Sequence, residues 1–252
     1  MALAVGTQHP PAHPPWTQVG WAIIILASSL VIGIGTGIGV YFFEVLVGSG
    51  SWYNSRTFAD VFTEIPTEIA LIWMVINRVR RSGNGPLARD LALLPIPRSR
   101  VFISVLAFEI LGTAYAMISI PLRPEYAFAA RRNLNVPLVD AFHAGPVLGS
   151  AYLINVILLA PIGEESLFRG WLWTALGPSW GIWPTALFTG AAWWLFHAYL
   201  GIETLKYLLL TAIILSLVRH YTGSVRATIV VHILDNVRLV IVAFVILLVA
   251  RH

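Results

Sequence analysis

The sequence predicts an all-α fold, a polytopic transmembrane helical bundle with about seven spans. Hydrophobic residues make up 58% of the 252 residues and charged residues only 11%, whereas soluble domains carry about 25% charged residues. The charges also cluster between long apolar runs. A soluble protein of this length could not cover so much apolar surface, so we expect lipid to be the solvent for most of the chain.

The apolar runs give the expected spans and the division of the chain. They cover residues 21–43, 58–77, 101–121, 146–176, 182–200, 203–219 and 226–250. The fourth run is interrupted at residues 161–163, and a broken helix there would raise the count to eight. We divide the chain into a polar N-terminal tail (1–20), the N-terminal spans 1–3 (21–145) with an Arg-rich connector (78–100), and a C-terminal core (146–250).

Charge and composition exclude several classes of protein. The Arg residues lie mainly between apolar runs, as topology determinants do, so the net charge of +4 does not indicate nucleic-acid binding. The connector 78–100 holds six Arg and is expected on the cytoplasmic side, together with Arg219 and Arg226. The chain has no Cys, which excludes disulfides and a Cys nucleophile. The tail lacks the basic region of a signal peptide, so we expect it to be retained.

Four glycines recur at every second position of the first span, at Gly33, Gly35, Gly37 and Gly39. They form two overlapping GxxxG pairs. No strand is expected before them, so they favour close helix packing over a phosphate-binding loop.

The segment PIGEESLFRG places Glu164, Glu165 and Arg169 inside an apolar run. Ionisable groups within spans are costly and are candidates for function. On a helix, Glu165 and Arg169 are four residues apart in the order that favours an ion pair. Glu164 points about 100° away and has no such partner, so it is a candidate general base. The alternative is a purely structural cluster that joins two helices.

His197 and Glu164 are predicted to lie at the same depth. Each is about 20 Å along its helix from the turn GPSWG that joins the two spans. An antiparallel hairpin would therefore bring them level, although a lone His in an aromatic run is more often a packing residue.

His232 and Asn236 share one helical face in VVHILDN. Imidazole and carboxamide donors can together stabilise an oxyanion. Asp235 and Arg238 can pair on another face. The alternative is a polar seam between helices. Straight helices would leave His232 about 10 Å short of Glu164, so a broken or tilted helix would be needed to join them.

At these motifs the sequence resembles the CPBP family of intramembrane proteases, which includes the type II CAAX prenyl endopeptidases and the bacterial Abi proteins. The family pattern is EExxxR, FxxxH and HxxxN or HxxxD on successive membrane helices. This chain has EESLFR (164–169), WWLFH (193–197) and HILDN (232–236). The resemblance covers about residues 146–240. Trp193 stands where the family usually has Phe, an exchange expected to affect pocket shape more than chemistry.

The resemblance implies that residues 146–250 form the catalytic core of a glutamate-type intramembrane endopeptidase. Its roles, carried onto this chain, are a water activated by Glu164 with His197, an oxyanion hole of His232 and Asn236, and support from Glu165 and Arg169. It favours a site without a cofactor. The alternative is zinc held by Glu164, His197 and His232.

The expected substrate is a membrane-embedded or lipid-anchored peptide, which the residues alone do not identify further. The expected location is the cell membrane of a bacterium or archaeon, with several spans. Two other functions remain open. One is a non-catalytic scaffold or immunity protein on the same fold. The other is a proton-coupled transporter with Glu64, Glu68 and Glu109 as a relay, although no internal repeat is visible.

Overall fold

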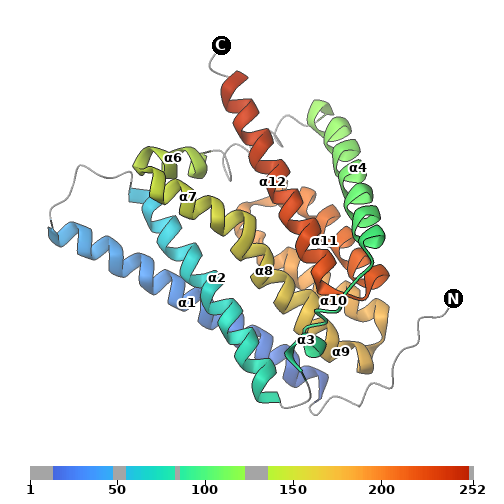
Figure 1. Ribbon diagram of the computed structural model, residues 1–252. Helices are drawn as coiled ribbons and strands as arrows, with labels where there is room; N and C mark the ends of the chain where they lie inside the picture. The colour runs from blue at the N-terminus through green and yellow to red at the C-terminus, as the bar shows by residue number, and fades with distance from the viewer. Residues whose placement is uncertain (1–13, 48–54, 83–85, 123–135, 250–252) are drawn as a thin grey trace.

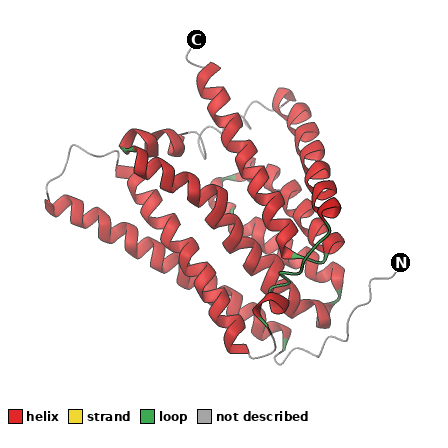
Figure 2. Cartoon of the chain, in the orientation of Figure 1, coloured by secondary structure: helices red, strands yellow, loops and turns green. Residues whose placement is uncertain are grey.

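The computed structural model describes residues 14–47, 55–82, 86–122 and 136–249, and these residues contain helices but no strand (Figure 2). The prediction of an all-α fold is therefore confirmed for the described part of the chain. In order, the helices are α1 (Pro15–Val47), α2 (Ser55–Ser82), α3 (Leu87–Asp90), α4 (Arg98–Leu122), α6 (Val136–Ala144), α7 (Pro146–Ile154), η2 (Asn155–Leu159), α8 (Ala160–Glu165), η3 (Ser166–Leu172), α9 (Trp173–Trp180), α10 (Ile182–Phe196), η4 (Ala198–Leu200), α11 (Ile202–Thr222) and α12 (Val225–Val249).

The helix bounds differ from the expected runs by five residues or more at three places. α1 begins at Pro15, so residues 15–20 of the expected tail are helical. α2 continues to Ser82 and α3 occupies part of the expected connector. The segment between the third and fourth expected spans contains α6, whose residues include the buried Leu138 and Ala141. Apolar burial against its neighbours accounts for a helix between the two spans.

One long helical rod runs through the middle of the molecule (Figure 1). It consists of α7, η2, α8, η3 and α9, which follow one another without a gap from Pro146 to Trp180. The segments η2 and η3 are π-helical. The predicted interruption at residues 161–163 is therefore wrong, and so is the eighth span based on it.

A π-helical turn explains how the rod continues through Pro161. In η2 the hydrogen bonds reach back five residues, and the N–H of Ala160 donates to the carbonyl of Asn155. The next bond in this register would join residue 161 to Val156, but proline has no N–H. The side chain of Asn236 replaces it, because its Nδ2 donates to the Val156 carbonyl at 2.7 Å.

The longest of the other helices are arranged on two sides of the rod, with α4 packed mainly against α11 and α12 (Figure 1). α1 and α2 lie on one side, and α4, α11 and α12 on the other. α1 approaches α2 at Gly33, where an added Cβ would lie 1.9 Å from Thr67 Oγ1. This close approach confirms the packing prediction for Gly33. Gly35 and Gly39 face open space.

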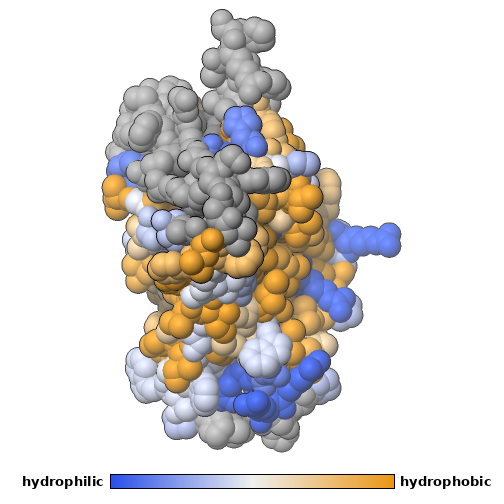
Figure 3. Space-filling model, turned by 90° about the vertical axis from the view of Figure 1, so that its left-hand side faces the viewer, coloured by the Kyte–Doolittle hydropathy of each residue, from blue (hydrophilic) through white to orange (hydrophobic). Residues whose placement is uncertain are grey.

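The core lies where the rod meets its neighbours. Its largest cluster joins Leu167, Phe168, Leu172 and Leu176 of the rod to residues of α1, α2 and α10. Many large apolar side chains remain exposed on the outside, and they cover much of the middle of the face in Figure 3, whereas polar side chains gather at its lower end. Such an extent of exposed apolar surface is unusual for a soluble monomer.

Two described segments are long and apolar enough to cross a membrane, Pro15–Phe43 and Pro146–Trp180. The count of about seven spans is not confirmed and stays a prediction. The connector after α3 and the turn before α12 meet, because Ser224 Oγ donates to the Leu94 carbonyl at 2.7 Å and Val225 N to the Ala92 carbonyl at 3.0 Å. Arg226 therefore follows a turn that lies beside the residues of the connector after α3, and the membrane side of both stays a prediction.

Candidate active site

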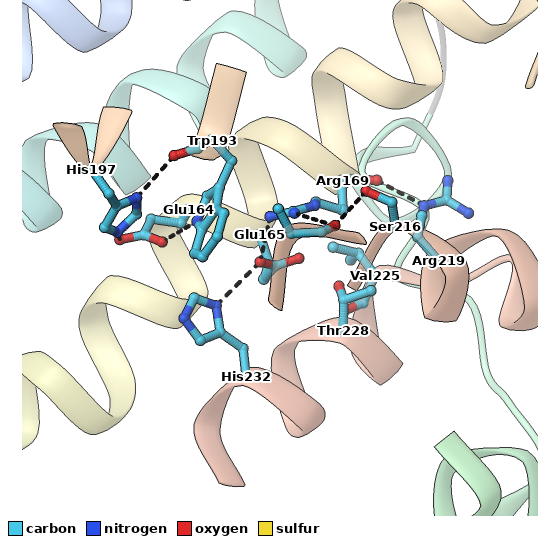
Figure 4. A network of polar contacts seen from close by, with 11 residues as sticks. Glu164, Glu165, Arg169, Trp193, His197, Ser216, Arg219, Val225, Thr228 and His232 are labelled. Atoms are coloured by element: carbon cyan, nitrogen blue, oxygen red, sulfur yellow. Dashed lines mark hydrogen bonds and ion pairs between the residues drawn. The ribbon is translucent and has the colours of Figure 1, made fainter. Parts of the chain in front are cut away.

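The two adjacent acids of the EExxxR motif lie at the centre of the bundle. Glu164 and Glu165 end α8, with exposed fractions of 5% and 0%. Because successive helical residues point about 100° apart, the two carboxylates face different neighbours. Each one contacts a different histidine (Figure 4).

Glu165 joins Arg169 to His232. Arg169 Nη1 donates to Glu165 Oε1 at 2.9 Å, and both residues are fully buried, so the predicted ion pair is confirmed. His232 Nδ1 lies 3.2 Å from the same oxygen. A carboxylate only accepts hydrogen bonds, so this contact assigns a proton to Nδ1 and orients the ring with Nε2 on its far side. The sequence predicted the ion pair but not its contact with His232.

Glu164 faces His197. Their Oε1 and Nε2 atoms lie 3.6 Å apart, which confirms that the two residues are level. His197 directly follows α10, and its Nδ1 lies 2.9 Å from the carbonyl of Trp193 one turn earlier. This contact directs Nε2 toward the carboxylate. The separation between Oε1 and Nε2 exceeds a direct hydrogen bond.

Trp193 contacts the rings of both histidines. Its indole Nε1 donates to Glu164 Oε2, and its ring packs edge-on against His232 with centroids 5.7 Å apart. Because Phe has no such donor, the exchange of Phe for Trp adds a contact with the carboxylate that the sequence did not predict, and its effect on the chemistry stays a prediction. The sequence signal for this contact was the indole N–H of Trp193, a donor within an apolar run.

α12 reaches the site because its first residue lies deep in the molecule. Arg219, near the end of α11, donates through Nε to the carbonyl of Arg169 at 2.7 Å. Arg169 precedes Gly177 by eight residues, roughly 12 Å along a helix. The first residue of α12, Val225, is fully buried and donates its N–H to the Ala92 carbonyl, and the adjacent Leu91 carbonyl lies 3.2 Å from where a Cβ on Gly170 would be. α12 therefore starts near the level of Gly170, inward of the turn after α9, and it reaches the site without a break.

Asn236 lies one turn beyond His232 and contacts the rod. One hydrogen of its amide is used on the Val156 carbonyl. A carboxamide has two N–H donors, so a second one remains. Asp235 and Arg238 form the predicted pair, and Arg238 also contacts Glu109 with Nε and Oε2 3.5 Å apart.

α2 brings two further acids against the rod. Asn155 Nδ2 donates to Glu64 Oε2 at 3.1 Å. Glu68 is 7% exposed, and its Oε2 lies 2.6 Å from where a Cβ on Gly163 would be and has no hydrogen-bond partner among the described residues. Glu68 therefore faces the interior of the bundle.

Glu164, His197 and His232, the residues proposed as zinc ligands, do not form a metal-ligand set in the structure. Within the described ranges, no three His, Asp or Glu side chains lie in an arrangement that could hold a metal ion. His232 Nδ1 contacts Glu165 instead of joining Glu164 and His197. Activity without a metal stays a prediction, with zinc as the alternative.

A buried carboxylate that faces an imidazole inside an apolar helical bundle is typical of a general-base site shielded from bulk water. Residues 146–238, from the start of the rod into α12, match the family described as type II CAAX prenyl endopeptidase Rce1-like. The match confirms the resemblance to the CPBP proteases and includes all the motif residues of the site. Comparisons with curated proteins and with solved structures gave no match.

Proposed function

We propose that this chain is a multi-pass intramembrane endopeptidase of the glutamate type. The observation that carries the proposal is the buried contact of Glu164 with His197, with Oε1 and Nε2 3.6 Å apart. These residues come from α8 and from the end of α10, within the segment that matches the Rce1-like family. A buried acid that faces an imidazole suits proton transfer from water.

The proposed reaction begins with a water between Glu164 and His197. Glu164 takes a proton from the water as its oxygen attacks the carbonyl carbon of the scissile peptide bond. The C–N bond of the tetrahedral intermediate then breaks, and Glu164 returns the proton to the leaving amine. The reaction consumes one water and one peptide bond, leaves Glu164 in its starting state and needs no further reactant. The proposed mechanism uses no metal.

His232 and Asn236 are proposed to stabilise the oxyanion. Glu165 accepts from Nδ1 of His232, so Nε2 points away from Glu165 and donates to the oxyanion when the ring carries its second proton. Asn236 keeps one N–H after its bond to Val156. Donors aimed at the developing charge are typically worth about 10²–10³ in the chemical step.

The proposed substrate is a lipid-anchored peptide of the prenylated CAAX class. This choice follows the description of the matched family. An intramembrane site also favours a substrate that partitions into lipid, and the apolar exterior of the bundle favours several spans.

The test is cleavage of a farnesylated peptide with a quenched fluorophore in proteoliposomes. The wild-type protein should cleave it, and the same peptide without the prenyl group should be cleaved much more slowly. Glu164→Gln keeps the size of the side chain but removes the proton acceptor, so cleavage should fall to background while the melting temperature is retained.

Full activity of Glu164→Gln would contradict the glutamate mechanism. Absence of cleavage by the wild-type protein across prenylated and unmodified membrane peptides would instead favour the scaffold or immunity function. A transporter relay gains no support, since Glu109 contacts Arg238 on the α4 side of the bundle.

A further inference from the structure

Trp193 contacts every charged or titratable side chain of the site except Glu165 (Figure 4). Its indole Nε1 donates to Glu164 Oε2. Its ring lies 4.5 Å from the ring of His197 and 5.7 Å from that of His232, measured between centroids. The guanidinium carbon of Arg169 lies 5.0 Å above it. Only 1% of the surface of Trp193 is exposed, so neighbouring residues surround its side chain.

The indole has a single donor, and a buried indole N–H needs a partner. Here the partner is one oxygen of the base. Because that bond occupies Oε2 of Glu164, the other oxygen, Oε1, is the one that faces Nε2 of His197. The indole thereby selects which oxygen is free to accept a proton.

The backbone of the same residue orients the histidine. The carbonyl of Trp193 accepts from Nδ1 of His197 at 2.9 Å. One residue therefore holds both halves of the pair, the carboxylate through its side chain and the imidazole through its main chain. Since both contacts start from one turn of α10, their relative geometry is nearly rigid.

We propose that Trp193 is a positioning residue that presents Oε1 of Glu164 to the attacking water. This inference rests on the proposed endopeptidase activity and extends it to a residue at which the chain departs from the family pattern. A Phe at this position could fill the space, but it could not donate to the carboxylate. The indole N–H is therefore expected to act on the rate of the chemical step.

The first experiment compares Trp193→Phe with Trp194→Phe in the farnesylated-peptide assay. Trp194 is the matched control, because its indole N–H also makes one hydrogen bond, to the Leu205 carbonyl at 2.7 Å, outside the site. Trp193→Phe should lower kcat about 10- to 100-fold with KM changed less than about twofold, as loss of positioning does. Trp194→Phe should leave kcat within about threefold of wild type.

The second experiment does not depend on activity. Trp193→Phe is combined with Glu164→Ala, and the melting temperatures of the four proteins are compared in detergent. Trp193→Phe should lower the melting temperature when Glu164 is present and lower it clearly less in the Glu164→Ala protein. Such non-additivity reports the indole–carboxylate contact itself.

The outcomes separate the inference from the proposed function. If Trp193→Phe retains full kcat, loses activity through KM alone, or matches Trp194→Phe, the positioning role is overturned. If the changes in melting temperature are additive, the contact between the Trp193 indole and Glu164 is disproved. This test also works if the protein cleaves no peptide. Absence of wild-type cleavage together with non-additive shifts would overturn the endopeptidase and leave the contact standing.

Discussion

Glu165 is shared between a cation and an imidazole. Its Oε1 accepts from Arg169 at 2.9 Å and lies 3.2 Å from Nδ1 of His232, whereas its Oε2 has no partner among the described residues. Arg169 is also tied to the Ala212 carbonyl at 3.4 Å. The buried ion pair thus links the rod to α11 and α12, and it orients a histidine of the site.

Removing Arg169 should destabilise the protein strongly. Arg169→Ala leaves the Glu165 charge buried without its cation, which costs roughly 3–5 kcal/mol. The melting temperature in detergent should fall accordingly. The double variant Glu165→Gln with Arg169→Met should recover part of the loss, because neither side chain is then charged.

A solvated ion pair provides the control. Lys206 and Glu203 in α11 are partly exposed, with their closest atoms 2.6 Å apart. Exposed pairs contribute about 0–1 kcal/mol, so Lys206→Ala should change the melting temperature little. If Arg169→Ala melts no differently from Lys206→Ala, water screens the Glu165 pair and the ion pair does not stabilise the bundle.

At the scale of the helical elements, the rod depends on a side chain from another helix. Pro161 removes the backbone donor that would follow Ala160 in the π-helical register, and Asn236 of α12 supplies an N–H to the Val156 carbonyl. Asn236 is thereby given two roles. One hydrogen completes the backbone of the rod, and the other is proposed to serve the oxyanion.

The two roles of Asn236 can be separated with Pro161. Asn236→Ala should lower stability by about 1–3 kcal/mol, the cost of a buried carbonyl without a donor. It should also lower kcat about 10²–10³-fold. Adding Pro161→Ala returns a backbone N–H beside Val156, so the double variant should regain melting temperature without regaining turnover.

The single variant Pro161→Ala is the reference for this comparison and should keep most of its activity. Recovery of both stability and turnover in the double variant would assign Asn236 a structural role alone. A defect confined to KM in Asn236→Ala would move this face of α12 to substrate docking.

At the scale of the whole molecule, the site is assembled from three helices that are distant in the sequence. Glu164 comes from α8, His197 from the end of α10 and His232 from α12. These three side chains come from three different helices, so small changes in packing would move them relative to one another. A metal would need all three within tenths of an ångström of their ideal distances.

Cleavage should therefore not require a metal. His232 is bound to Glu165, and Asn236, one turn later, is a poor zinc ligand but a good donor to an oxyanion. Purified active protein should contain no stoichiometric zinc by elemental analysis, and strong chelation should leave the rate of peptide cleavage unchanged. Loss of zinc together with activity, and recovery of both on adding zinc back, would change Glu164 from base to ligand.

Much of the local structure follows from the sequence alone. The spacing of Glu165 and Arg169 predicts their ion pair, and equal distances from one turn predict that Glu164 meets His197. The motifs also predict the matched family. These features depend on contacts within one helix or one hairpin, for which helical geometry is a sufficient guide.

Only the tertiary structure decided how the third helix joins the site. The sequence does not reveal that the α11–α12 turn lies inward at the level of Arg169, or that His232 consequently meets Glu165. Nor does it reveal that the indole of Trp193 selects an oxygen of Glu164, or that Asn236 replaces the N–H missing at Pro161. Each of these contacts joins residues of different helices, and their positions depend on how far one helix is displaced along another. Periodicity within a single helix carries no information on that displacement, because it is determined by side-chain packing between helices.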